Sequence, residues 1–377
     1  MRILQINASY KPAYIYGGPT MSVSKLSEHL VHSGCEVQVF TTTANGATEL
    51  PVHQNTPIEV DGVPVYYFKR ITKDHSHFSP SLLKAVWKQV RRFDVVHIHA
   101  WWNTVSVLSA LVAIMRGVPV IISPRGTLSG YSFNNKNSFF KSCIHHLLGK
   151  HLLHRSYIHA TSAYEKNNLQ QIITAKQIMT IPNFIELPEI AAKTGDFAEP
   201  LKLLFFSRIE EKKGLDILLN ALVDVIIPWH LTIAGTGDPL YIARLKQLAV
   251  QNGIKANISW IGFQNENKFD IIAEHHLMVL PSYDENFGNV VIESLSVGTA
   301  VLISRQVGLA GYVTENNLGW ICDTNAPSIA DAINNMDTDR LIGISNRAPG
   351  IIRRDFNEAV LTQQYINMYQ QVTTQHG

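Results

Sequence analysis

Two glutamates in the second half of the chain are spaced so that they could bind two neighbouring sets of hydroxyl groups. In the segment PSYDENFGNVVIESLSVGTAVLIS, residues 281–304, Glu285 lies in a loop after an expected strand. Glu293 lies eight positions later, within the first turns of an expected helix. Carboxylates suit neutral hydroxyls because each oxygen accepts hydrogen bonds strongly. Taken singly, the two residues could equally be a solvated loop glutamate and a helix-surface glutamate.

The start of the helix that carries Glu293 is suited to an anion. The helix is expected to begin near Gly288 and Asn289. The first N–H groups, those of Gly288, Asn289 and Val290, have no acceptor within a helix, and they lie at the positive end of its dipole. A diphosphate bound there would leave Glu285 beside a sugar and Glu293 near a ribose.

Two cations follow an earlier expected strand. In LLFFSRIEEKKGLDILLNAL, residues 203–222, Arg208 comes directly after the strand and Lys213 stands just before a helix. A guanidinium and an ammonium are the two usual ways to bind phosphate oxygens. Both would stabilise the charge that develops on a departing diphosphate. Alternatively, the lysines pair with the two glutamates just before them in a solvated turn.

Glycine-rich turns follow two further expected strands. Gly235 and Gly237 in HLTIAGTGDP permit close backbone approach to a nucleotide, and Gly17 and Gly18 in YGGPT precede a helix whose amides could bind an anion. Each pair could equally be a tight turn that requires glycine for a positive φ.

Polar and aromatic residues leave strand ends in the first half of the chain, in DVVHIHAWWN and ISPRGTLSG. His97 lies within a strand pattern and is expected in the core. His99 and Arg125 are nearer strand ends and are the better candidates for a binding site. Trp101 and Trp102 could stack on sugar faces or pack in the core.

Short apolar strands alternate with amphipathic helices along the whole chain, which predicts parallel sheets covered on both faces. Ligands on such sheets bind beyond the carboxyl ends of the strands. The expected strands are MRILQI, CEVQVFTT, DVVHIHA, VPVIISP, SYIHATS, LKLLFFS, HLTIAG, NISWIG, HLMVLPS and TAVLIS. The expected helices include Pro19–His32, Pro80–Arg92 and Leu215–Leu222.

A change in pattern after Ile181-Pro182-Asn183 divides the chain of 377 residues into two Rossmann-like domains, 1–183 and 184–355. The segment IELPEIAAKTGDFAEP reads as a linker, and the second sheet begins at Leu201. A final helix runs roughly from Phe356 to Val372, and its own pattern does not say where it packs.

The charge is distributed unevenly between the two halves. Residues 1–183 contain 18 Lys and Arg against 8 Asp and Glu, a balance of +10, whereas residues 184–377 contain 14 against 22, a balance of −8. Three scattered cysteines indicate neither a disulfide framework nor a zinc site. With no signal-peptide pattern, we expect a soluble, cytoplasmic protein.

Together these segments resemble family 4 of the retaining GT-B glycosyltransferases, the glycosyl transferases group 1, and the resemblance covers nearly the whole chain. That family carries an early Gly-Gly loop, Gly-Arg…Lys-Gly, Ala-Gly-x-Gly and Glu-x-Phe-Gly…Glu-Ala…Gly. The matching positions are Gly17-Gly18, Ser207-Arg208…Lys213-Gly214, Ala234-Gly235-Thr236-Gly237 and Glu285-Asn286-Phe287-Gly288…Glu293-Ser294…Gly298.

The resemblance implies an α/β GT-B fold, in which two Rossmann-like domains face each other across a cleft. Domain 1–183 would bind the acceptor and domain 184–355 the nucleotide sugar, with helix 356–377 packed back on the first domain. The resemblance also assigns the donor contacts. Arg208 and Lys213 would bind the diphosphate, Glu285 the sugar and Glu293 the ribose. The remaining donor contacts would be Gly17, Gly18, Gly235, Gly237, Phe263 near the base, Phe287, Gly288, Asn289 and Val290.

The implied reaction moves a sugar, with retention, from a UDP- or GDP-linked donor to a glycan or glycolipid acceptor, as in bacterial surface polysaccharide synthesis. Retention would follow a front-face path in which the departing phosphate helps to deprotonate the acceptor. No Asp-x-Asp motif follows a strand, so we expect no metal and no other cofactor, and no nucleic-acid partner. Two positions depart from the family pattern: Ser207 replaces a glycine, and Arg125 stands where many relatives have a histidine.

Two other classes of function remain open. One is a sugar-nucleotide epimerase or phosphorylase of the same fold, which the pairing of Glu285 and Glu293 with Arg208 and Lys213 disfavours. The other is a non-catalytic protein that binds a nucleotide sugar. The substrates do not follow from the sequence.

A basic segment in the first half suggests a further partner. NNKNSFFKSCIHHLLGKHLLHR, residues 134–155, combines a broad apolar side with lysines, an arginine and four histidines. It is expected to be either a core helix with a solvated basic face or a surface that contacts an anionic lipid. The second reading predicts peripheral contact with the inner face of the membrane.

Overall fold

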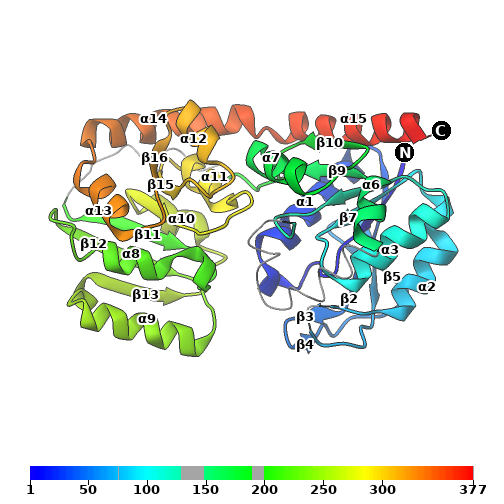
Figure 1. Ribbon diagram of the computed structural model, residues 1–377, viewed down its shortest axis with the longest axis horizontal. Helices are drawn as coiled ribbons and strands as arrows, with labels where there is room; N and C mark the ends of the chain where they lie inside the picture. The colour runs from blue at the N-terminus through cyan, green and yellow to red at the C-terminus, as the bar shows by residue number, and fades with distance from the viewer. Residues whose placement is uncertain (75, 129–147, 189–198, 377) are drawn as a thin grey trace. The chain divides into compact units, whose positions relative to one another are not determined.

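A computed structural model describes the chain except for residues 75, 129–147, 189–198 and 377. The chain forms two compact units, one comprising Met1–Ile185 with Glu358–Gly377 and the other comprising Glu186–Asn357 (Figure 1). Each unit is a mainly parallel sheet with helices packed against it, and each is described here separately.

The sheet of the first unit has the strand order β10-β9-β8-β7-β1-β2-β6-β5. All pairs are parallel except β5 with β6, so the expectation of a wholly parallel sheet is wrong at this edge. The strands are β1 (Arg2–Ile6), β2 (Glu36–Thr42), β5 (Pro57–Val60), β6 (Val63–Phe68), β7 (Val95–His99), β8 (Val120–Ser123), β9 (Tyr157–Ala160) and β10 (Gln177–Thr180). A separate hairpin joins β3 (Ala44–Asn45) and β4 (Thr48–Glu49).

Helices pack against the sheet of the first unit, with α2, α3 and α6 in contact in succession and α1 in contact with the C-terminal α15. Side chains that cap N-termini fix two of the starts, Ser79 at α2 and Asn103 at α3. The helices are η1 (Tyr14–Tyr16), α1 (Gly18–His32), α2 (Pro80–Gln89), η2 (Val90–Arg92), α3 (Thr104–Met115), α6 (Lys150–His154), α7 (Ala163–Ile172) and α15 (Glu358–His376).

The second unit has a parallel sheet with the order β13-β12-β11-β14-β15-β16. Its strands are β11 (Leu201–Phe206), β12 (Trp229–Ala234), β13 (Ile258–Gly262), β14 (Leu277–Leu280), β15 (Ala300–Ser304) and β16 (Gly319–Cys322). Its helices are η4 (Glu211–Lys213), α8 (Leu215–Ala221), α9 (Pro239–Gln251), η5 (Lys255–Asn257), α10 (Lys268–Ala273), α11 (Asn289–Ser296), α12 (Ala310–Glu315), α13 (Ala326–Asn334) and α14 (Thr338–Asp355).

Alternation along the strands of the first unit separates two different faces. Leu4, Ile6, Val96 and Ile98 belong to the buried apolar cluster that also includes α2 and α3 residues. The intervening positions include polar side chains that are also fully buried. These are Gln5, His97, His99, Ser123 and His159. The first unit therefore has an apolar core on one face of its sheet and a buried polar strip on the other.

All ten expected strands are present, with ends that differ by one or two residues. The edge strands β5, β10 and β16 were not expected, and neither was β6. The last helix begins at Glu358, and it belongs to the first unit.

Candidate functional site

The carboxyl ends of four neighbouring strands position the candidate residues of the second unit. Arg208 follows β11, Gly235 follows β12, Phe263 follows β13 and Glu285 follows β14. These strands are adjacent in the sheet and parallel, so all four residues lie at one edge. This is the edge at which ligands bind to open parallel sheets.

Lys213 and Glu285 form an ion pair at this edge. Lys213 ends the turn η4, and both side chains are largely buried, with 9% and 17% of their areas exposed. Burial alone would raise the pKa of Glu285, but the charges of Lys213, Lys212 and Arg208 outweigh it and hold that pKa below its ordinary value. The carboxylate is therefore ionised and can accept hydrogen bonds from hydroxyls.

This pairing excludes one alternative for Lys213. A solvated turn would have paired it with a neighbouring glutamate, whereas its partner is Glu285, 72 positions later. The neighbouring Glu210 instead pairs with Arg208 at 2.6 Å, and about half of the Arg208 side chain is exposed. Arg208 is thus accessible to a ligand.

The backbone of Glu285 is fixed by the loop after β15. Its N–H donates to the carbonyl of Gln306 at 3.1 Å, and its carbonyl accepts from the N–H of Gly308 at 2.8 Å. Gly288 caps the following helix with φ 89°, and a Cβ there would lie 3.1 Å from Val307. The helix α11, with Asn289 and Val290 as its first residues, therefore begins four positions after this anchored glutamate.

Glu293, on α11, is paired with Lys268 at 3.0 Å. The exposed fractions of the Glu293 and Lys268 side chains are 14% and 22%, so both are partly accessible. Lys268 is the first residue of α10, and sequence reasoning missed it. Only the packing of α10 against α11 brings the two residues together.

The glycines after β12 have a structural explanation. A Cβ on Gly235 would lie 1.9 Å from the carbonyl oxygen of Ser207, and one on Gly237 would lie 2.0 Å from that of Ile209. Both glycines are required for the close packing of two loops. The requirement for glycine does not depend on a bound nucleotide. The close packing does, however, place the loop after β12 alongside Arg208.

The two candidate phenylalanines differ in exposure. Phe263 is 59% exposed, so its ring is available to a base. Phe287 is only 3% exposed and lies edge-on to Phe356, with ring centroids 6.4 Å apart. Phe287 thus packs in the second unit's interior, and only its backbone remains for a ligand.

In the first unit, Arg125 lies beside α1, the helix that begins in the Gly17-Gly18 turn. Gly17 is the N-cap residue with φ 66°, and Gly18 is the first helical residue. Nη1 of Arg125 donates to Ser22 Oγ of α1 at 2.9 Å and to Asn183 Oδ1 at 2.7 Å. Burial lowers the pKa of Arg125, but a guanidinium stays charged at neutral pH.

Most of the other candidates of the first unit are buried, and Trp102 is partly buried. His97 and His99 are both fully buried, which confirms the core position of His97 but leaves His99 without access to an acceptor. Trp101 is also fully buried and packs in the core. The indole N–H of Trp102 donates to the carbonyl of Thr127 at 2.5 Å. His99 can act only through its neighbours.

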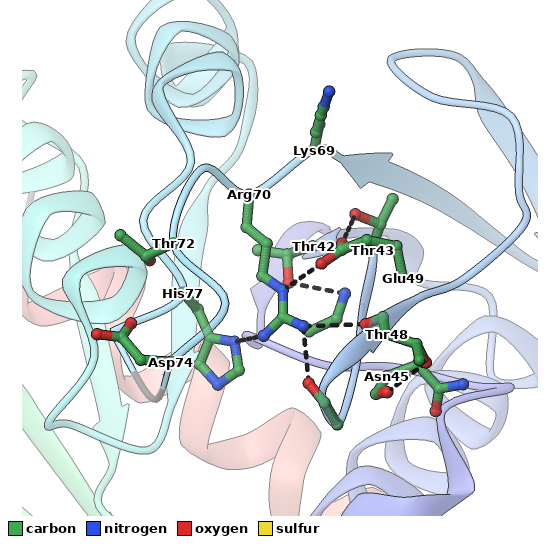
Figure 2. Close-up of polar contacts among 12 residues, drawn as sticks. Thr42, Thr43, Asn45, Thr48, Glu49, Lys69, Arg70, Thr72, Asp74 and His77 are labelled. Atoms are coloured by element: carbon green, nitrogen blue, oxygen red, sulfur yellow. Dashed lines mark hydrogen bonds and ion pairs between the residues drawn. The ribbon is translucent and has the colours of Figure 1, made fainter.

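A buried arginine that was not predicted organises three loops at this edge of the first sheet (Figure 2). Arg70, which lies after β6, donates to Glu49 at 2.7 Å and lies 3.3 Å from His77 Nδ1. It also donates to the carbonyl of Gly46 at 2.7 Å, and the N–H of Gly46 donates to Tyr16 Oη at 3.1 Å. Arg70 therefore connects the β3–β4 hairpin to the residue that precedes Gly17.

Much of the basic segment 134–155 lies outside the described residues. In the described part, α6 buries Leu152 and Leu153 and exposes its basic side, Lys150, His151 and His154. Among the residues the structure describes, no helix is long and apolar enough to cross a membrane. The same residues contain no cluster of three metal-ligating side chains.

Comparison with known proteins defines the class. A crystal structure of HepE from Anabaena in complex with UDP-glucose superposes with a TM-score of 0.76 at 19% identity, over 98% of this chain and all of that one. The fold is therefore GT-B. Residues 16–188 match the model of Glycosyltransferase Family 4, and residues 187–349 match that of Glycosyl transferases group 1. The chain belongs to this family of glycosyltransferases.

Two curated relatives align over most of the chain. An uncharacterized glycosyltransferase of Methanocaldococcus jannaschii is 27% identical in an alignment that covers 90% of each chain. A D-inositol 3-phosphate glycosyltransferase of a Nocardioides species is 24% identical in an alignment that covers 84% of this chain and 77% of that one.

Proposed function

We propose that this glycosyltransferase takes its sugar from a nucleoside diphosphate donor and transfers it with retention of configuration. The donor site is the edge of the second sheet where Lys213 and Glu285 are paired. The single observation that carries the proposal is this buried pair beside the N-terminus of α11, with Arg208 half exposed nearby. UDP is the favoured nucleotide because HepE, a protein of the same fold, binds UDP-glucose.

Each group has a role in the transfer. Arg208, Lys213 and the first amides of α11 bind the diphosphate, and they stabilise the charge that it gains as its bond to the sugar carbon breaks. Glu285 accepts hydrogen bonds from sugar hydroxyls, and Glu293, held by Lys268, accepts those of the ribose. No metal is needed to neutralise the phosphates.

Retention follows if the acceptor oxygen attacks the face of the sugar carbon from which the phosphate departs. The new carbon–oxygen bond then replaces the old one on the same side. The acceptor proton passes to the oxygen of the departing phosphate, so no protein carboxylate has to act as a nucleophile. Glu285 is ionised and anchored by Lys213, an arrangement that suits a hydroxyl acceptor better than a nucleophile.

The acceptor is proposed to bind the first unit, where Arg125 offers an anion-binding group. Nε and Nη1 of Arg125 are hydrogen-bonded, whereas Nη2 has no partner among the residues that the structure describes. The excess of positive charge in residues 1–183 favours a glycan or glycolipid acceptor with a phosphate or carboxylate. The Nocardioides relative is named for an acceptor of this chemistry, inositol phosphate.

The exposed basic side of α6 supports a proposed contact with anionic lipid. Basic residues near an anionic membrane contribute about 1 kcal/mol each, and salt screens that attraction. Sedimentation with vesicles of neutral and of anionic lipid, at low and high salt, tests the contact. We expect salt-sensitive binding to the anionic vesicles only; equal binding to both, or none to either, would contradict it.

A panel of nucleotide sugars tests the donor. Release of nucleoside diphosphate is measured with each donor and with phosphate-bearing or lipid-linked glycan acceptors, and NMR of the product gives the anomeric configuration. We expect one donor to be turned over, with an anomer that matches the donor. An isomerised donor formed without acceptor would identify an epimerase. Transfer to inorganic phosphate would identify a phosphorylase, and donor binding without turnover a binding protein.

A further inference from the structure

Five polar side chains form a continuous strip on one face of the first unit's sheet. They are Gln5 of β1, His97 and His99 of β7, Ser123 of β8 and His159 of β9, and all are fully buried. In a sheet of this kind both faces are usually apolar. Burying a polar group costs free energy unless it is hydrogen-bonded, so each of these five side chains needs a hydrogen-bond partner.

The C-terminal helix α15 supplies two of those partners, and it lies along the first unit (red in Figure 1). Tyr369 Oη lies 2.8 Å from His97 Nδ1 and accepts from Gln5 Nε2 at 3.0 Å. Tyr365 Oη, one turn earlier, lies 3.3 Å from His159 Nε2 and donates to the carbonyl of Pro182 at 3.1 Å. Both tyrosines are buried.

The direction of every hydrogen bond between Arg125 and Tyr369 is fixed by chemistry. A guanidinium can only donate, so His99 Nδ1 accepts from Arg125 Nε, at 3.3 Å. His99 Nε2 then carries the proton and donates to Gln5 Oε1, at 2.7 Å. The amide nitrogen of Gln5 donates to Tyr369, whose hydroxyl is left to donate to His97 Nδ1.

The same order continues to an obligatory acceptor at the far end. His97 Nε2 donates to Ser123 Oγ at 2.6 Å, and the hydroxyl of Ser123 donates to His159 Nδ1 at 2.6 Å. His159 Nε2 donates to the carbonyl of Ile181 at 2.8 Å. A chain that begins at a group that can only donate thus ends at one that can only accept, with all three histidines neutral and protonated on Nε2.

From this chain we infer that Tyr369 is a positioning residue for Arg125, acting through Gln5 and the tautomer of His99. Nη1 of Arg125 donates to Ser22 and Asn183, which anchors one end of the guanidinium. The bond from Nε to His99 anchors its other side, while Nη2 has no partner among the residues that the structure describes. Its consequence for turnover rests on the proposed function of Arg125.

NMR of the unaltered protein provides the first test, because it needs no variant and no substrate. With ¹⁵N-labelled histidine, long-range ¹H–¹⁵N spectra distinguish the two tautomers. We expect His97, His99 and His159 to carry the proton on Nε2. A proton on Nδ1 of His99 would break the chain at its first step and overturn the inference.

Two matched variants provide the second test. Tyr369→Phe removes the hydroxyl between Gln5 and His97, and Tyr365→Phe removes a buried hydroxyl that contacts the chain only at its far end, 3.3 Å from His159 Nε2. We expect the Nε–H of Arg125, followed with ¹⁵N-labelled arginine and assigned with Arg125→Lys, to exchange with water at least about tenfold faster in Tyr369→Phe only. The same exchange rate in both variants and the unaltered protein would overturn the inference.

Turnover of the donor that the nucleotide-sugar panel identifies completes the test. We expect Tyr369→Phe to lower kcat about three- to tenfold in the normal background, and not further in Arg125→Lys, because the effect passes through Arg125. An equal loss in both backgrounds would overturn the inference. Full activity of Arg125→Lys would instead show that the proposed function of Arg125 is wrong, while the NMR results still decide the hydrogen-bond chain.

Discussion

The ammonium of Lys213 and the carboxylate of Glu285 neutralise each other at the edge of the second sheet, in a position where neither is well exposed. A buried charge that loses its partner is strongly destabilising, so each residue fixes the other. When a diphosphate reaches the N-terminus of α11, it can share Lys213 with Glu285. In the proposed donor site, Lys213 would bind phosphate and Glu285 would accept hydrogen bonds from hydroxyls.

Replacing a phosphate-binding cation should lower turnover far more than replacing its neighbour. For Lys213→Ala and for Arg208→Ala we expect kcat to fall roughly 100- to 1,000-fold, the cost of losing one preorganised contact to a developing charge. Lys212→Ala is the matched control, with less than about a threefold loss. Steady-state rates of nucleotide release check this, and near-normal rates in both variants would refute the assigned phosphate site.

Activity should survive removal of divalent cations. In the proposed donor site, Arg208, Lys213 and the amides of α11 would neutralise the phosphates without a metal. Rates measured in excess EDTA should stay within about twofold of those in magnesium, well under the tenfold that 1.36 kcal/mol of barrier represents. Complete loss in EDTA, restored by magnesium or manganese, would mean that a metal completes the site.

The part of the site that sequence predicted well is the part set by strand order. Arg208 and Glu285 each follow an apolar strand, and parallel strands bring their carboxyl ends to one edge. The partner of Glu293 was not predictable, because Lys268 reaches it only through the packing of two short helices. The sequence also could not decide whether Lys213 pairs with its neighbours or with Glu285, because that choice depends on how the turn that ends at Lys213 packs beside the loop after β14.

The polar strip of the first unit did leave a signal in the sequence. His97 and His99 are two positions apart in an otherwise apolar strand, so they must share a face. What the sequence lacked was the covering helix, since the pattern of α15 alone did not say where it packs. The role of Arg70 had no signal either, because a single arginine after a strand is usually solvated.

Arg70→Met should destabilise the first unit and loosen the β3–β4 hairpin. It removes the cation that bonds Glu49 and the carbonyls of Gly46 and Thr48 (Figure 2), which should cost about 3 kcal/mol. Lys69→Met, at the exposed neighbour, should change the free energy of unfolding by less than about 0.5 kcal/mol. Urea unfolding measures both values.

Hydrogen exchange at Gly46 checks the structural cause of the Arg70 effect. Its N–H donates to Tyr16 and should be protected in the unaltered protein and in Lys69→Met, but exchange faster in Arg70→Met. Unchanged protection in a destabilised Arg70→Met would show that the arginine does not hold the hairpin.

Because of the buried histidines, we expect the free energy of unfolding to begin to fall at a higher pH than titration of the carboxylates alone would cause. Burial lowers the pKa of His97 and His99 well below the ordinary value, and it lowers that of His159 to about 3. In the unfolded chain each histidine titrates near about 6.5. Between about 6.5 and 3, therefore, the unfolded state binds more protons, and stability that is fully present above pH 6.5 falls as the pH falls.

The size of this effect can be measured. Each histidine contributes up to about 1.4 kcal/mol per pH unit, so the three together give at most about 4 kcal/mol per unit. Glu28, whose pKa is lowered to about 2 by Lys11, Ser24 and Lys25 despite burial, lowers the free energy of unfolding only below about pH 4.5.

Urea unfolding between pH 8 and pH 5 therefore measures the contribution of the histidines alone. His159→Gln should reduce the slope. A free energy of unfolding that stays constant from pH 8 to pH 5 would mean that the histidines are not held neutral by the fold.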